Sequence, residues 1–92
     1  MSSPVDITLV TAASCHFCAD AQTILDTLSG TYPMRVRLVD MMSDDGRELV
    51  VKHRMPFPPL LIVDGTVFGY GRISERKLTK HLAALANTVE VK

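Results

Sequence analysis

The stretch VDITLVTAASCHFCAD, residues 5–20, contains both cysteines of the chain, with two residues between them. VDITLV alternates apolar and polar residues before it becomes fully apolar, a pattern that predicts a strand whose far end is the more buried. After the small residues TAAS, apolar side chains repeat at the spacing of a helix, at Ala21, Ile24, Leu25 and Leu28. The sequence therefore places Cys15 and Cys18 at the start of a helix that follows a strand.

The segment after this helix predicts an edge strand and a short second helix. MRVRLVD, residues 34–40, places Val36 and Leu38 on one face and two arginines on the other, which is typical of a strand at a sheet edge. Ser43 can then cap a short helix, and Pro56 ends it.

The stretch LLIVDGTVFGYG, residues 60–71, predicts a hairpin, because Asp64 and Gly65 suit the two-residue turn that antiparallel strands prefer. Ser74 can cap a last helix, whose inner stripe consists of Leu78, Leu82 and Leu85. The elements therefore follow in the order β-α-β-α-β-β-α.

This order predicts one α/β domain over residues 1–92, with a core at about residues 5–86. The first β-α-β unit requires a parallel pair of strands with a right-handed crossover. The hairpin then adds an antiparallel pair to the same sheet, so the sheet is expected to be mixed.

The composition excludes several classes of function. Ten basic and ten acidic residues cancel, so no charge-driven attraction to nucleic acid or to an anionic membrane is expected. The longest apolar runs are about five residues, whereas a membrane-spanning helix needs roughly 20. We therefore expect a cytoplasmic monomer. Because cytosolic thiols are kept reduced, a cysteine pair in that compartment indicates redox chemistry or metal binding rather than a structural disulfide.

The position of the pair predicts unequal roles for its two thiols. A helix N-terminus stabilises a thiolate through its unpaired N–H groups and its dipole, and Cys15 occupies that place. Cys18 lies one turn further in, on the face of Ala21 and Leu25, and is expected to be less exposed. We interpret Cys15 as the attacking thiol and Cys18 as the thiol that resolves the mixed disulfide. This chemistry requires neither a metal nor an organic cofactor.

His16 and Phe17, the two residues between the cysteines, each have two interpretations. A protonated His16 would add positive charge beside the thiolate and lower the pKa of Cys15 further, or its imidazole simply faces solvent. Phe17 either contacts the substrate or covers the site. Two other functions also remain open: a metal carrier that uses Cys15 and Cys18, with His16 or the Met41-Met42 pair as further ligands, and a binding module without catalysis.

With these features the chain resembles a glutaredoxin-like member of the thioredoxin superfamily, from Val5 to about Leu85. The resemblance depends on the strand, TAASCHFC and helix in sequence, on the proline before the third strand in PFPPLLIVDG, and on the ending FGYGRISERKL. It implies the thioredoxin-like, glutaredoxin-type fold, a four-stranded mixed sheet with helices on both faces. It also implies a dithiol oxidoreductase that reduces or exchanges protein or small-molecule disulfides, with a reductase or a low-molecular-weight thiol as electron donor.

The resemblance further implies a substrate groove. In the family the proline before the third strand is cis and lies against the cysteine motif, and Pro59 matches it. The residue before that proline offers its N–H and C=O to a bound substrate, but Pro58 has no N–H, so one of these hydrogen bonds cannot form. The alternative is a cis bond between Phe57 and Pro58, which would shift the groove by one residue. Gly71 and Arg72 fall where the family has a Gly-Gly pair followed by an acidic residue.

The same resemblance makes glutathione a candidate co-substrate. Glutathione-using relatives commonly carry a lysine shortly before the first cysteine, where Ala12 and Ala13 stand here. The glutathione contacts therefore look incomplete. Arg54 or Arg72 could replace one contact to a carboxylate through a bidentate guanidinium pair.

Overall fold

The computed structural model describes residues 4–91, and the side chains of residues 4–85. Its elements follow the predicted order: β1 (Val5–Thr11), α1 (His16–Ser29), β2 (Met34–Asp40), α2 (Asp44–His53), β3 (Leu60–Val63), β4 (Thr66–Tyr70) and α3 (Glu75–Val91). No helix in the described part of the chain is long and apolar enough to cross a membrane.

The four strands form one mixed sheet in the order β2-β1-β3-β4. β1 and β2 are parallel, as the β-α-β connection requires, whereas β3 is antiparallel both to β1 and to β4. β1 and β3 are therefore the central strands, and β2 lies at an edge. The predicted mixed sheet and the edge position of β2 are both confirmed.

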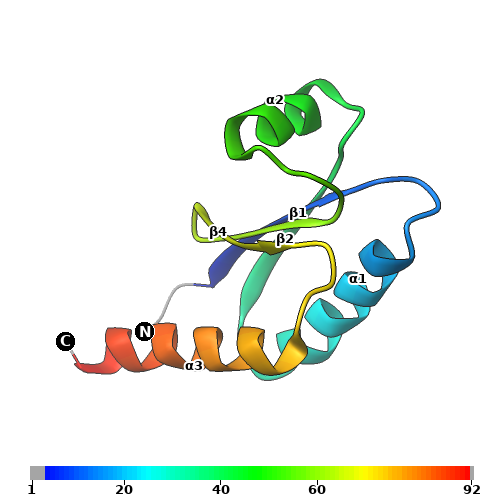
Figure 1. Cartoon of the computed structure of the whole chain (residues 1–92). Helices are drawn as coiled ribbons and strands as arrows, with labels where there is room; N and C mark the ends of the chain where they lie inside the picture. The colour runs from blue at the N-terminus through cyan, green and yellow to red at the C-terminus, as the bar shows by residue number, and fades with distance from the viewer. Residues whose placement is uncertain (1–3, 92) are drawn as a thin grey trace.

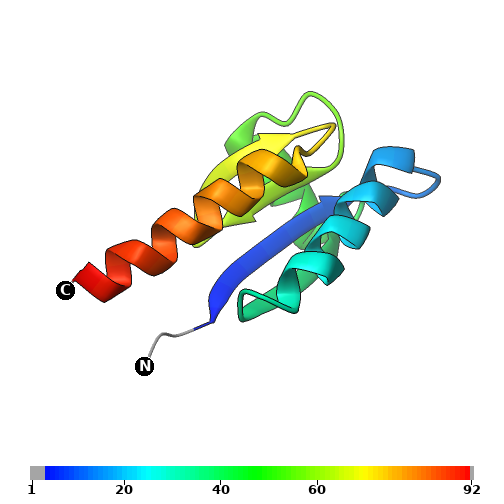
Figure 2. The ribbon, with the colours of Figure 1, turned by 90° about the horizontal axis from the view of Figure 1, so that it is seen from below.

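Helices cover both faces of this sheet. α1 and α3 lie on one face and α2 lies on the other (Figures 1 and 2). The core under α1 and α3 includes Ile7, Leu9, Leu61, Leu25 and Leu78, all of them buried. A smaller core under α2 is formed by Val10, Val39, Met55, Leu60 and Ile62. The alternation of side chains along β1 and β3 thus fills a core on each face of the sheet.

The edge strand β2 contributes less to the core than its apolar residues suggest. Val36 and Leu38 pair with Ile7 and Leu9, which places them on the face of α1 and α3. They are nevertheless 44% and 54% exposed, and only Val39, on the α2 face, is buried. The helices therefore cover the central strands better than this edge.

The predicted caps and turn are also present. Ser43 Oγ accepts the N–H of Gly46 at 3.1 Å, and Ser74 Oγ accepts the N–H of Lys77 at 3.2 Å. Asp64 and Gly65 have φ angles of 49° and 81°, the left-handed conformation that the two-residue hairpin turn needs. Local capping and turn chemistry therefore agree with the tertiary fold.

Candidate functional site

Three of the connections that leave one end of the sheet contain the predicted site residues. Val10 near the end of β1 pairs with Leu60 at the start of β3, and Leu60 pairs with Tyr70 at the end of β4. The loop after β1, the loop before β3 and the loop after β4 consequently leave the sheet at the same end. Both cysteines, the proline pair and the Gly71-Arg72 segment are brought together there.

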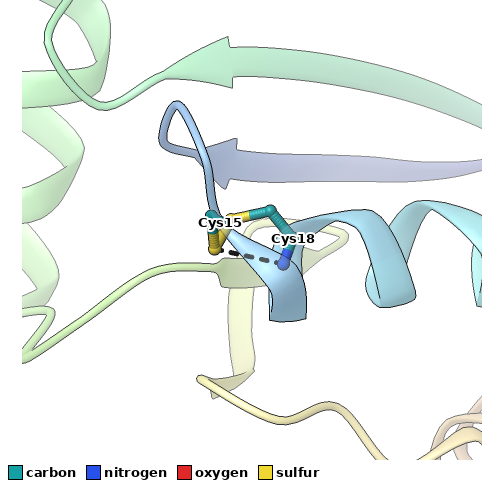
Figure 3. The surroundings of a disulfide bond; sticks show 2 residues. All are labelled: Cys15 and Cys18. Atoms are coloured by element: carbon teal, nitrogen blue, oxygen red, sulfur yellow. Dashed lines mark hydrogen bonds between the residues drawn. A yellow bond between two sulfur atoms is a disulfide. The ribbon is translucent and has the colours of Figure 1, made fainter.

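Cys15 occupies the N-cap position of α1. Its backbone is extended, with φ −104° and ψ 110°, and the helix begins at the next residue. The Sγ of Cys15 accepts a hydrogen bond from the N–H of Cys18 at 3.1 Å, and the two cysteines are joined by a disulfide (Figure 3). The sulfur therefore takes the place of the side-chain oxygen that commonly caps a helix.

The two sulfurs differ in exposure, as the sequence predicts. Cys18 is 2% exposed and lies in the same buried face of α1 as Ala21 and Leu25. Cys15 is only partly buried. An external reactant can therefore reach Cys15 more easily than Cys18, which is the arrangement that separate attacking and resolving roles require.

The proline pair lies at the start of β3, beside the loop that carries Cys15. Pro59 is fully buried, and the bond between Pro58 and Pro59 is cis, as expected from the resemblance. The carbonyl of Pro59 accepts the N–H of Gly71 at 2.8 Å. This hydrogen bond joins the loop before β3 to the loop after β4.

Two exposed aromatic rings stand beside these loops, and neither was identified from the sequence. Phe57 and Tyr70 contact each other edge to face, with ring centroids 5.6 Å apart, and each ring is about half exposed. Gly71 has a φ of 71°, and a Cβ at this position would overlap the ring of Phe57. The missing side chain of Gly71 thus leaves the space in which the ring of Phe57 lies.

His16 and Phe17 are both exposed. The Nε2 of His16 lies 3.6 Å from Oδ2 of Asp20, one turn along α1, and both side chains are open to solvent. Asp20 was not predicted, although an acidic residue four positions after a histidine in a helix is a recognisable signal for such a pair. The structure therefore gives His16 a carboxylate partner on the outer face of α1.

A groove lies between the first turns of α1 and the start of α3. Its volume is about 580 Å³, and Phe17, Asp20 and Ile24 line one side. Arg72, Ile73 and Glu75 line the other side. The groove combines apolar walls with charges of both signs, and it begins next to the cysteine motif. Of the residues predicted to bind substrate, Phe17 and Arg72 border this groove.

Comparisons with known proteins give a fold but no family. No protein-family model matches the chain. No curated protein matches it either.

Solved thioredoxin structures do resemble it. A single-residue mutant of thioredoxin from Halobacterium salinarum has 20% identity over 89% of this chain and 74% of its own, with a TM-score of 0.68. For the oxidised mitochondrial thioredoxin 3 of Saccharomyces cerevisiae the identity is 19%, the coverages are 90% and 80%, and the TM-score is 0.65. The likeness confirms the thioredoxin-like fold that the resemblance implies. The glutaredoxin type stays a prediction, because the fold does not distinguish it from the thioredoxin type.

Proposed function

We propose that this chain with a thioredoxin-like fold is a thiol-disulfide oxidoreductase that uses Cys15 as nucleophile and Cys18 as resolving thiol. The observation that carries the proposal is the inequality of the two sulfurs. Cys15 caps α1 and is partly exposed, whereas Cys18 is buried within reach of Cys15. A structural disulfide has no need of one accessible sulfur at a helix N-terminus.

The reaction proceeds in two exchanges. The Cys15 thiolate attacks one sulfur of a substrate disulfide, the substrate S–S bond breaks, and the sulfur that leaves takes a proton. The Cys18 thiol loses its proton and attacks Sγ of Cys15, so that the mixed disulfide breaks and the second substrate sulfur leaves and is protonated. The substrate thus gains two electrons and two protons, and the Cys15–Cys18 pair becomes the disulfide present in the structure.

The surroundings of Cys15 favour the charged form that attacks. In the disulfide, its sulfur accepts the N–H of Cys18, and it stands at the positive end of the α1 dipole. Both interactions stabilise a thiolate more than a thiol, so we expect the pKa of Cys15 to lie below that of a free cysteine. Cys18 is shielded from solvent, which limits its reaction to the neighbouring sulfur.

The proposed substrates are disulfides of proteins or small molecules, and the proposed electron donor is a reductase or a low-molecular-weight thiol. Substrate would lie along the loop of Pro58 and Pro59 and along Gly71, Arg72 and Phe17, which surround Cys15 at this end of the sheet. Glutathione stays one candidate among the small thiols. The charges of both signs in the groove are compatible with a zwitterionic molecule, and the absence of a lysine at Ala12 and Ala13 argues against it.

The proposal is tested by the reduction of bis(2-hydroxyethyl) disulfide, a neutral small disulfide, by the fully reduced protein. We expect the wild-type protein to form the Cys15–Cys18 disulfide and to release two equivalents of mercaptoethanol. Cys15→Ser should abolish the reaction. Cys18→Ser should stop at a mixed disulfide on Cys15, visible as an added mass of one mercaptoethanol. Equal residual activity in the two variants would refute the assignment of roles.

The metal-carrier alternative has less support. Within residues 4–85, no three His, Cys, Asp or Glu side chains lie close enough together to hold a metal ion. Two thiolates are half of a closed zinc site. Elemental analysis of the purified protein separates the alternatives, because a carrier should contain one metal ion per chain that is lost when both cysteines are replaced.

A further inference from the structure

The first two turns of α3 carry an excess of positive charge. Arg76, Lys77 and Lys80 are exposed there, and Glu75 is the one acidic residue among them. We call Arg76, Lys77 and Lys80 the basic face. The neighbouring helix α1, on the same face of the sheet, has acidic residues and neither lysine nor arginine (Figure 2). The basic face is thus a local feature of a chain whose charges sum to zero.

None of these cations is used inside the described part of the molecule. Among the side chains of residues 4–85, the ion pairs are His16–Asp20, Arg35–Asp6 and Arg37–Asp45. The basic face has no partner in this set, and neither has Arg72. The positive charges of α3 are therefore available to an external partner.

The stability of α3 does not explain why Arg76 and Lys77 lie in its first turn. The N-terminus of a helix is the positive end of its dipole, where cations are unfavourable and anions are favourable. α2 follows this rule, with Asp44 and Asp45 in its first turn and Lys52 and His53 in its last. α3 has Glu75 at its start, but Arg76 and Lys77 follow at once in the same turn. The cations thus lie where they oppose the dipole of their own helix.

The start of α3, from which the basic face extends, borders the same groove as the cysteine motif. Arg72, just before α3, borders the groove that Phe17 and Asp20 border from α1. Phe17 stands between the two cysteines in the sequence, and α3 begins three residues after Arg72. A partner whose disulfide reaches Cys15 across this groove would therefore extend over the first turns of α3.

We propose that the basic face docks an acidic surface of the protein whose disulfide exchanges with Cys15. This inference rests on the proposed function and adds a partner chemistry to it. Charge complementarity defines the partner, because Arg72 at the groove and the three cations of the basic face together attract carboxylates. The acidic patch should be confined to the part of the partner that lies over α3 and Arg72, because Asp20 and Asp26 are exposed on α1 and would repel an anion that extends over both helices, as a long nucleic acid does.

Peptide disulfides of opposite charge test this inference. Two synthetic peptides, each closed by one intramolecular disulfide, would be identical except for four flanking glutamates in one and four lysines in the other. We expect the acidic peptide to oxidise the reduced protein roughly three- to tenfold faster at low salt, because opposite charges raise the association rate. The ratio should approach one at 1 M salt, where the screening length falls to about 3 Å.

A matched pair of double variants separates a local surface from total charge. One double variant, Arg76→Gln with Lys80→Gln, removes an arginine and a lysine from exposed positions of α3. The other, Arg47→Gln with Lys52→Gln, removes the same two residue types from exposed positions of α2. The α3 pair should reduce the acidic preference at least twofold, and the α2 pair should keep the wild-type ratio. Equal effects of the two pairs, or no preference in the wild-type protein, would overturn the inference.

Three further outcomes are informative. If bis(2-hydroxyethyl) disulfide oxidises the protein normally while the peptides show no charge preference, the docking inference fails and the proposed function stands. If no disulfide reacts, both fail together. Tight binding of a short DNA duplex that is lost in the α3 pair, without any peptide preference, would assign the basic face to nucleic acid instead.

Discussion

The two ends of the sheet differ in how their polar groups are paired and in what they expose. At the hairpin end, Asp64 Oδ1 accepts the N–H of Asp6 at 2.9 Å, and the carbonyl of Asp6 accepts the N–H of Asp64 at 2.8 Å. Arg35 adds an ion pair to Asp6. The loops at the cysteine end instead expose the rings of Phe57 and Tyr70, border a groove and leave Cys15 partly exposed. Hydrogen bonds therefore connect the strands at the hairpin end, whereas Cys15 at the other end is accessible to reactants.

Both ends contain a glycine in the left-handed region, which allows a matched comparison. Gly65 has a φ of 81°, and a Cβ there would have no atom within 4 Å, whereas a Cβ at Gly71 would overlap Phe57. Backbone strain is common to the two positions, but steric displacement occurs at Gly71 alone. Alanine substitutions at the two positions thus separate the free-energy cost of backbone strain from the cost of displacing Phe57.

The largest expected effect follows from Gly71→Ala. The left-handed backbone should cost roughly 1–2 kcal/mol of unfolding free energy. Displacement of the half-exposed ring of Phe57 should add a smaller cost, up to about 1 kcal/mol, because the ring can move toward solvent. Urea unfolding measures the sum, and the rate of disulfide reduction should also fall. Gly65→Ala is the control, with a loss of roughly 1–2 kcal/mol and an unchanged rate. Equal losses of stability in the two variants would contradict the packing of Phe57 over Gly71.

A smaller effect is expected from the hairpin end itself. Asp64→Ala removes the acceptor for the Asp6 N–H and a residue that tolerates a positive φ, and should lower the unfolding free energy by about 1–2 kcal/mol. Asp64→Asn keeps the side-chain oxygen and should stay within about 0.5 kcal/mol of the wild-type protein. Both variants should reduce disulfides at the wild-type rate. A loss of activity in either would show that the two ends are coupled.

Pro58→Val should strengthen substrate binding at the cysteine end. Valine restores the main-chain N–H that Pro58 lacks, and one added hydrogen bond is worth about 0.5–1.5 kcal/mol. The KM for a synthetic peptide disulfide should therefore fall about two- to tenfold. Pro56→Val adds an N–H in the same loop, two residues earlier, and should leave the KM unchanged. An unchanged KM in Pro58→Val would mean that substrates dock through other contacts.

The smallest effect is expected from His16→Ala. A protonated imidazole next to Cys15 stabilises its thiolate, so removal of His16 should raise the pKa of Cys15, and the effect should be small because His16 is exposed. The pH dependence of alkylation measures the change. His53→Ala, at the end of α2, is the control and should have no effect. If the pKa of Cys15 does not move, the solvent-facing reading of His16 is correct.

The sequence was sufficient for the order of elements and for the position of the cysteines, because both depend on local signals. Apolar periodicity defined β1 and α1, Asp64-Gly65 defined the hairpin, and Ser43 and Ser74 defined two helix starts. Prediction of the cis bond before Pro59 required the family resemblance, since nothing in the local sequence shows whether the bond before Pro58 or the bond before Pro59 is cis.

The aromatic contact at the site could not be predicted, because it depends on pairing between distant segments. Leu61 pairs with Gly69 and Ile62 pairs with Val67, so one extra residue, Phe68, is inserted in β4. This bulge moves Tyr70 opposite Leu60 instead of Pro59, where it meets Phe57. The groove likewise requires α1 and α3 to pack side by side, which no short sequence signal specifies.

The proposed function requires Cys15 to be the accessible, activated thiol and Cys18 to be shielded. Its most direct test is alkylation of the fully reduced protein with iodoacetamide over a range of pH, with each labelled cysteine identified by peptide mass. We expect Cys15 to react first at every pH, with a midpoint below the free-thiol value of about 8.5, and Cys18 to react only slowly. Faster labelling of Cys18, or a midpoint for Cys15 at or above that value, would contradict the account.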